Sequence, residues 1–178
     1  MKMPLVLFRS YYGSTLQYAQ WLAQSLSCPC FDVRKVPKSA LIHHDPIVFG
    51  GGLYAGKMAG ASALLREEAL LLDKHLVVFT VGASDPTDTS KYAQLIEKTF
   101  SPALRAQTAF FHPRGNLEYS KMSFQHRTMM KLLKKMVEKM PPQQRSQEDQ
   151  DILSTFGVDT YFVDESALAP ILDHIKTL

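Results

Sequence analysis

The chain has 178 residues, of which 46% are hydrophobic and 21% charged, a composition typical of a single globular domain with a sizeable core. The net charge of +3 is mild and does not indicate a nucleic-acid-binding protein. No apolar run approaches the ~20 residues that a membrane helix needs, and the first residues lack the pattern of a signal peptide. We therefore expect one cytoplasmic domain over residues 1–178.

The sequence gives no indication of a metal or disulfide site. Cys28 and Cys30 are separated by one proline, a spacing that is poor for a disulfide, and no cluster of histidine and cysteine completes a metal site. His43 and His44 precede Asp45 without a third ligand nearby, which favours a surface turn over a metal site. We expect two ordinary thiols in a reducing compartment.

Strands and helices are predicted to alternate along the chain. Apolar runs and alternating segments predict strands at 4–8, 31–36 (an edge strand), 46–49, 76–82, 104–111 and 157–163. Helical spacing of apolar residues predicts helices at 15–26, 59–72, 88–100 (capped near Thr87 or Asp88), 124–140 and 167–178. This alternation argues for a parallel sheet covered by helices on both faces.

The segment SYYGST, residues 10–15, leaves the first strand and enters the first helix. In such a sheet ligands collect at the carboxyl ends of the strands, and the first free N–H groups of the helix favour an anion. Ser10, Ser14 and Thr15 can donate hydroxyl hydrogen bonds, and Gly13 allows close approach. The segment matches neither a P-loop nor GxGxxG, so a mononucleotide phosphate fits better than a dinucleotide. The alternative is that Ser14 or Thr15 merely caps the helix.

Two further turns carry the same kind of residues at strand ends. GGGLYAGK at 50–57 combines glycines, which suit a backbone that passes close to something, with Tyr54, which could stack on a flat ring. TVGASDP at 80–86 again places glycine and hydroxyl groups after a strand. We expect all three turns to meet at one edge of the sheet.

These motifs resemble the flavodoxin superfamily, most closely the flavodoxin-domain branch that includes the menaquinone-dependent protoporphyrinogen dehydrogenases. The resemblance is carried by YGST (12–15), GGGLYAGK (50–57), VVFTVG (77–82), KMSFQHRTMMKLLKKMVEKMPP (121–142) and FGVDTYFVDESALAPIL (156–172). It implies an α/β flavodoxin-like three-layer sandwich with a five-stranded parallel sheet in the order 2-1-3-4-5. It also implies FMN as the cofactor.

The resemblance assigns a role to each turn. The FMN phosphate would be held by Ser10, Tyr11, Tyr12, Gly13, Ser14 and Thr15. The isoalloxazine would be bordered by Leu53, Tyr54 (covering one face), Ala55 and Gly56, and its pyrimidine edge by Val81, Gly82, Ala83 and Asp85. Three features depart from ordinary flavodoxins: Tyr12 stands where threonine is usual, the third turn lacks a second stacking aromatic, and Ala55 replaces a common glycine. A peptide flip at Ala55 would be harder than at glycine, which argues against one-electron carrier chemistry.

Residues 112–156 interrupt the alternation as a predicted helical insert. Within 121–140 six basic residues stand against one glutamate, and apolar side chains at 129, 133, 136 and 140 form a stripe, so the helix is basic and amphipathic. Such a helix can contact an anionic membrane, where a quinone would be reached, or an acidic partner. It can also simply pack on the sheet. His112, Arg114 and Tyr119 start the insert, where they could contact an anionic substrate, and Arg9 could position an anion.

Three functions follow from these patterns. The first is an FMN-dependent oxidoreductase acting on a small-molecule substrate, of the protoporphyrinogen- or quinone-linked dehydrogenase type, peripheral at the inner membrane face. The second is an electron-carrier flavodoxin that docks a redox partner protein. The third is a flavin-less module that binds a partner protein. No residue of the chain is identified as a catalytic acid or base.

Overall fold

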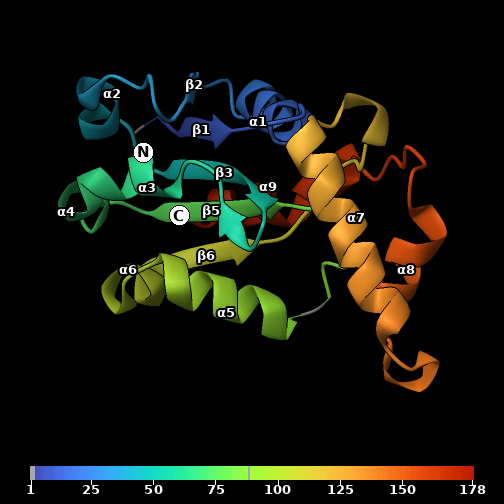
Figure 1. Ribbon diagram of the computed structural model, residues 1–178. Helices are drawn as coiled ribbons and strands as arrows, with labels where there is room; N and C mark the ends of the chain where they lie inside the picture. Colours follow the sequence, from blue (N-terminus) through green and yellow to red (C-terminus); the bar gives the residue numbers. More distant parts are fainter. Residues whose placement is uncertain (1–2, 88) are drawn as a thin grey trace.

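The computed structural model describes residues 3–87 and 89–178, and its centre is a parallel sheet (Figure 1). The sheet strands are β1 (Leu5–Arg9), β2 (Cys30–Asp32), β3 (Ile47–Tyr54), β5 (Leu76–Val81) and β6 (Thr108–Phe111). They lie in the order β2-β1-β3-β5-β6, which confirms the predicted 2-1-3-4-5 order of five parallel strands. A sixth, short strand, β4 (Lys57–Met58), pairs antiparallel with the end of β3.

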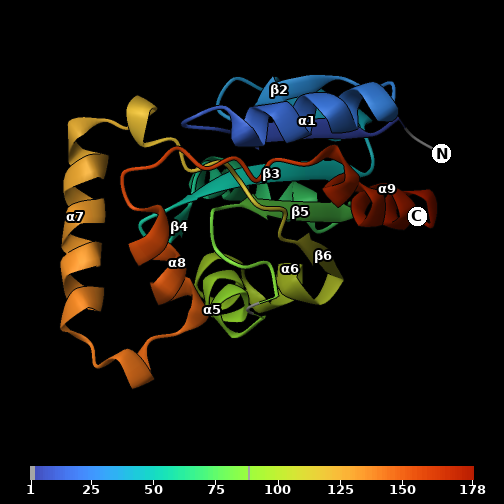
Figure 2. The same cartoon turned by 90° about the vertical axis from the view of Figure 1, so that its right-hand side faces the viewer.

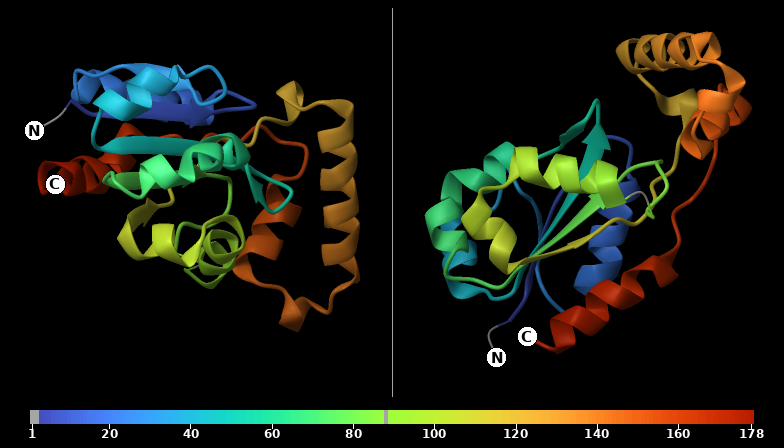
Figure 3. Two further views of the ribbon diagram at one scale, coloured as in Figure 1. Left: turned by 90° about the vertical axis from the view of Figure 1, so that its left-hand side faces the viewer. Right: turned by 90° about the horizontal axis from the view of Figure 1, so that it is seen from below.

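Helices cover both faces of the sheet and complete a flavodoxin-like three-layer sandwich (Figures 2 and 3). One face is covered by α1 (Ser14–Ser25) and α9 (Ala169–Lys176). The other is covered by α2 (Lys38–His43), α3 (Ala61–Leu64), α4 (Glu68–Leu71), α5 (Thr89–Thr99) and α6 (Pro102–Gln107). Side chains alternate along β1, with Leu5 and Leu7 in one core and Val6 in the other. Burial on both faces explains why the central strands are continuous apolar runs.

The predicted edge strand 31–36 is wrong in extent, because β2 covers only Cys30–Asp32, and two other predicted elements are wrong in extent too. The predicted strand 104–111 begins as helix α6, because Ser101 caps it and Pro102 stands at its start, and only Thr108–Phe111 is a strand. The predicted helix 59–72 is broken into α3, a 3₁₀ turn at Leu65–Glu67 and α4. Of the two predicted caps of α5, Asp88 lies outside the described residues.

The predicted strand at Gly157–Val163 is also wrong. In this segment Thr160 forms a single antiparallel bridge with Leu117, and the main sheet gains no strand from it. Asn116 instead fixes the segment, because its side-chain oxygen accepts hydrogen bonds from the N–H groups of Phe162 and Val163, each at 2.9 Å. The bridge therefore closes the base of the insert.

The insert stands beyond the carboxyl ends of the strands (Figure 2). Its helices are α7 (Phe124–Lys139) and α8 (Gln147–Thr155), with Pro141-Pro142 after α7 as predicted. Helix α7 packs against α8 and does not lie on the sheet, so packing on the sheet is the wrong alternative for it. Among the described helices none is both long and apolar enough to cross a membrane.

Candidate cofactor site

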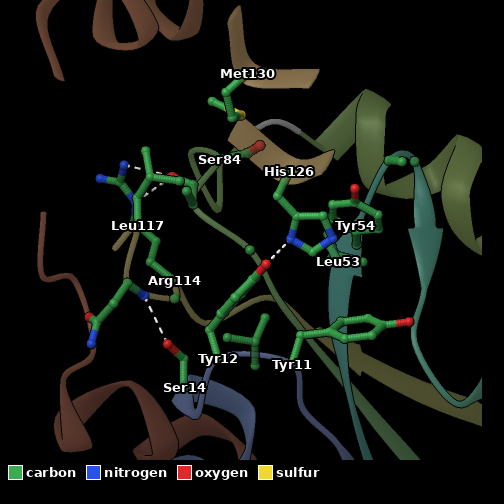
Figure 4. A pocket seen from close by; sticks show the side chains of 18 of the residues that line it. Tyr11, Tyr12, Ser14, Leu53, Tyr54, Ser84, Arg114, Leu117, His126 and Met130 are labelled. Atoms are coloured by element: carbon green, nitrogen blue, oxygen red, sulfur yellow. Dashed lines mark hydrogen bonds between the residues drawn. The ribbon is translucent and has the colours of Figure 1, made fainter. Parts of the chain in front are cut away.

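The loops after β1, β3 and β5 open into one cavity of about 970 Å³ (Figure 4). Its lining includes thirteen of the fourteen predicted site residues: Ser10, Tyr11, Tyr12, Ser14, Thr15, Leu53, Tyr54, Ala55, Gly56, Val81, Gly82, Ala83 and Asp85. Gly13 shapes the first loop without lining the cavity. The three turns therefore meet as predicted, in a space of the size that small-molecule sites have (~300–1,000 Å³).

The first loop presents the N-terminus of α1 to the cavity. Gly13 stands at the N-cap with φ 102° and supplies no side chain, and the first turn of α1 contains no acidic residue. Neither Ser14 nor Thr15 caps the helix, so the capping alternative is wrong. Ser10 Oγ accepts the Gly13 N–H at 3.0 Å, which leaves its own proton to donate. Free N–H groups, hydroxyls and the helix dipole together suit an anion.

Ser14 also has a structural task that the sequence did not indicate. Its hydroxyl accepts the Asn116 N–H at 3.0 Å, which ties the base of the insert to the start of α1. Buried Tyr18, one turn further along α1, donates to the Arg114 carbonyl at 2.9 Å and accepts the Asp164 N–H at 3.0 Å. Helix α1 therefore positions the first loop, the start of the insert and the segment that follows the insert.

The glycines of the second turn serve packing more than ligand contact. A Cβ at Gly50 would lie 2.1 Å from the Phe79 ring, and one at Gly51 would lie 2.5 Å from the Met58 side chain. Of the three successive glycines only Gly52 lines the cavity, and a Cβ there would lie 3.1 Å from the hydroxyl oxygen of Thr15. The close approach predicted for these glycines is present, but Gly50 and Gly51 approach side chains of the protein core and not a ligand.

Ala55 and Gly56 form the tight turn between β3 and β4, with φ values of 49° and 71°. Both angles lie in the left-handed region, as two-residue hairpin turns require. Alanine pays about 1–2 kcal/mol for this conformation. The residue at which a flip was expected to be difficult therefore already holds a positive φ.

Four aromatic rings gather between the first two turns, and one of them was not predicted (Figure 4). His126 of α7 lies over Tyr54 with ring centroids 3.8 Å apart, and shares a hydrogen bond with the Tyr12 hydroxyl. Tyr11 packs against both Tyr54 and His126, at 5.8 and 6.2 Å. Sequence reasoning missed His126 because nothing local places the start of α7 over the second turn. The unusual tyrosine at position 12 was the available signal.

The third turn is braced from the insert. Arg114 donates two hydrogen bonds to the Ala83 carbonyl, at 2.8 and 3.1 Å, and its guanidinium lies 3.6 Å over the Phe162 ring. The Gly82 carbonyl accepts the Gly115 N–H at 2.8 Å. Arg114 is thus engaged in holding this turn, a role different from the substrate contact considered for it.

Asp85 lies exposed at the rim of the cavity. Its carboxylate accepts hydrogen bonds from the Thr87 hydroxyl at 2.7 Å and the Thr87 N–H at 2.8 Å, and these bonds lower its pKa below the ordinary value. The Asp85 carboxylate therefore stabilises the turn from residue 85 to residue 87. Any contact with a ligand at this edge would add to that local role.

Sequence comparison identifies the family to which the chain belongs. A profile described as the flavodoxin domain matches residues 5–144. The chain belongs to the flavodoxin domain family. Family membership indicates a flavin cofactor, and the predicted flavodoxin-like fold is confirmed. No curated protein matches the chain significantly.

Several solved structures resemble this flavodoxin-domain protein at low sequence identity. A candidate flavoprotein from Bacteroides eggerthii has 13% identity and a TM-score of 0.48 over 63% of this chain and 86% of its own. The Trp repressor binding protein of Bacillus subtilis has 18% identity and a TM-score of 0.45, with 63% and 83% covered. An archaeal flavodoxin has 15% identity and a TM-score of 0.40, with 62% and 84% covered.

In this flavodoxin-domain protein the same cavity extends beneath α7, and we call this part of it the outer chamber. Its walls are mostly apolar and come from three helices: Leu95 of α5, Met129, Met130, Leu133 and Met136 of α7, and Ile152 of α8. Methionine side chains adapt to irregular shapes. Three of the four positions of the apolar stripe predicted for the insert helix, Met129, Leu133 and Met136, therefore line a cavity, and Met140 does not.

His112 and Tyr119 do not reach the cavity as substrate contacts. His112 stacks on Tyr92 with centroids 3.8 Å apart and shares a 2.7 Å hydrogen bond with Thr80. Burial lowers the pKa of His112 to about 4, so the ring is neutral at pH 7. Tyr119 is buried with its ring against Phe156. Both residues support the start of the insert.

The burial of His112 predicts a loss of stability in acid. Because its folded pKa of about 4 lies below the unfolded value of 6.5, the unfolded chain binds the extra proton between these values. The stability contributed by the neutral His112 ring is therefore complete above pH 6.5 and is lost as the pH falls towards 4. We expect the free energy of unfolding to fall by about 2 kcal/mol more in wild type than in His112→Phe over this range.

Urea unfolding at a series of pH values measures this difference. His43→Gln, at an exposed histidine, serves as the control and should follow wild type. Parallel pH profiles for wild type and His112→Phe would contradict the assignment.

The remaining candidates lie outside the cofactor cavity. Arg9 forms an ion pair with Asp32 at 3.0 Å, so its charge is used there. Asp45 next to His44 pairs with His75 at 3.2 Å, and no described group of three metal-ligating side chains is present. The thiols of the two cysteines are free, and burial raises the pKa of each to about 11, which makes them unreactive at neutral pH.

Proposed function

We propose that the chain binds FMN in the three-loop cavity and acts as an FMN-dependent oxidoreductase. One observation carries this proposal: the uncapped N-terminus of α1 opens into the same cavity as Tyr54 and the third turn. The first feature suits a phosphate, and the others suit a flat ring. When bound, the flavin supplies the capacity to accept a hydride or electrons.

The residues of the chain would hold and orient this cofactor. Phosphate oxygens would receive hydrogen bonds from Ser10, Thr15 and the first N–H groups of α1. Leu53 and Tyr54 would flank the ring, and the turn at 81–83 would border its pyrimidine edge. The mostly apolar lining of the cavity would exclude water from the ring.

The outer chamber favours an enzyme over an electron carrier. A carrier passes electrons through an exposed ring edge, whereas this cavity of about 970 Å³ extends past the three turns to an apolar lining beneath α7. We therefore propose a small-molecule substrate, with a protoporphyrinogen- or quinone-linked dehydrogenase as the leading type. Reductive titration tests the alternative: a single two-electron step supports the enzyme, and two separate one-electron steps support the carrier.

We also propose that α7 contacts an anionic membrane surface. Phe124, Leu132 and Met136 are exposed apolar side chains on this helix, with 84%, 58% and 65% of their surface accessible, and the last two also line the cavity. Lys131 and Lys135 are exposed beside them. Lysines next to exposed apolar groups suit an interfacial helix. Sedimentation with phosphatidylglycerol vesicles but not with phosphatidylcholine vesicles is expected, and equal sedimentation with both would contradict it.

The proposed cofactor is tested by titrating apoprotein into FMN and following fluorescence and the visible spectrum. We expect quenching and a shifted flavin band at micromolar protein. Thr15→Ala and Tyr54→Ala should each weaken binding about fivefold, since each removes one contact worth about 1 kcal/mol. Thr99→Ala and Tyr161→Ala, which lie outside the cavity, are the matched controls. A folded protein that does not bind FMN would overturn the proposal and favour the flavin-less module.

A further inference from the structure

Within the cavity, one face of the Tyr54 ring is covered by a side chain of the protein itself. The His126 imidazole lies 3.8 Å from the Tyr54 ring, at an interplanar angle of 32° (Figure 4). Both side chains line the same cavity. A third ring between them would need two contacts of ~3.5 Å each, about twice the present separation. His126 and a stacked flavin therefore cannot occupy their positions at the same time.

His126 is held in this position by the phosphate loop. Its Nδ1 shares a hydrogen bond with the Tyr12 hydroxyl, which also accepts the Ser123 N–H at 3.4 Å. The Tyr12 and His126 rings meet edge to face, with centroids 5.2 Å apart. Tyr12 is the residue that replaces the threonine usual in flavodoxins, so the departure from the family pattern creates the contact that holds His126.

We propose that His126 is an intrinsic competitor of the flavin ring, which leaves the face of Tyr54 when FMN binds. This inference rests on the proposed function, since it concerns the same cavity. Binding requires the stack with Tyr54 and the hydrogen bond to Tyr12 to break. The cost of breaking them reduces the apparent affinity for FMN, as for any site that is competent only part of the time.

His126 stands on the helix that walls the outer chamber. His126 belongs to the first turn of α7, and Met129, Met130 and Leu133 on the next turns wall that chamber. Arg127 ties the same turn to the Tyr119 and Ser120 carbonyls at 3.1 and 3.0 Å. His126 would therefore leave Tyr54 from a position next to the walls of the outer chamber.

The test compares FMN affinity and association rate in wild type, His126→Ala and His126→Phe. Alanine removes the competitor, so we expect about tenfold tighter binding and faster association. Phenylalanine restores a ring that can cover Tyr54, so it should bind FMN more weakly than the alanine variant. Thr128→Ala, on the exposed side of α7, is the matched control and should equal wild type. Circular dichroism checks that each variant is folded.

The outcomes separate this inference from the proposed function. Weaker or unchanged FMN binding in His126→Ala would contradict the proposed competition between His126 and the flavin, and it would leave the proposed FMN site unaffected. FMN binding to neither wild type nor His126→Ala would overturn both. A second readout uses the His126 ring protons in NMR spectra: we expect an upfield shift from Tyr54 in the apoprotein and its loss on adding FMN. An unchanged His126 signal at saturating FMN would also overturn the inference.

Discussion

Replacing Ser10 by aspartate is expected to lower the affinity for FMN about 100-fold relative to replacing it by asparagine. The two side chains have nearly the same shape, and each can accept the Gly13 N–H as Ser10 does. Only aspartate places a negative charge beside the bound phosphate. Two like charges about 4 Å apart repel by about 4 kcal/mol near a protein surface, and screening by salt reduces this to the expected value.

Isothermal titration of both variants with FMN measures this difference, and riboflavin provides the control. Riboflavin carries no phosphate, so the aspartate and asparagine variants should bind it equally. Thermal unfolding should show similar stabilities, because aspartate near the N-terminus of a helix does no harm. Equal FMN affinities of the aspartate and asparagine variants would show that the phosphate does not bind beside residue 10.

Gly50→Ala is expected to destabilise the protein by about 3 kcal/mol, the largest effect on stability that we predict. The new Cβ would lie 2.1 Å from Phe79 Cζ, and the Phe79 ring is fully buried between the sheet and the helices above it. Overpacking of this kind typically costs about 1–3 kcal/mol, and this contact is at the severe end. Gly50 lies on the central strand β3, so little adjustment of the backbone is available.

A double-mutant cycle separates this clash from other effects of the substitution. Phe79→Leu shortens the side chain opposite Gly50, so Gly50→Ala should cost at least 1 kcal/mol less in that background. Gly13→Ala provides a comparison without a clash. A Cβ there would meet no atom within 4 Å, so its cost comes from the φ of 102°, which strains any side chain. Equal costs of Gly50→Ala in both backgrounds would contradict the packing explanation.

The strands of the sheet could be predicted because they depend on local signals, whereas their order was implied by the resemblance to the flavodoxin superfamily. Continuous apolar runs mark the strands buried on both faces, and helical spacing marks the segments between them. The error at 104–111 had a local signal too: Ser101-Pro102 is a cap followed by proline, which predicts the start of α6. The segment 157–163 had no such signal. Its alternation is typical of a strand, but Asn116 and Leu117 hold it outside the sheet.

The convergence of the three turns could also be predicted, since parallel strands bring their carboxyl ends to one edge. The roles of individual residues were less accessible. Gly50 and Gly51 are small because Phe79 and Met58 pack over them, a contact between distant parts of the chain. His126 comes from a helix whose placement depends on the whole insert. Such contacts have no periodicity, so only the structure reveals them.

The central claim is that this cavity holds the phosphate of FMN at the start of α1. The most direct test is to titrate one preparation of apoprotein with FMN and with riboflavin under the same conditions. We expect FMN to bind at micromolar concentration or below, and riboflavin at least tenfold more weakly, since it lacks the charge-assisted hydrogen bonds of the phosphate. Equal affinity for the two flavins, or binding of neither by the folded protein, would contradict the account.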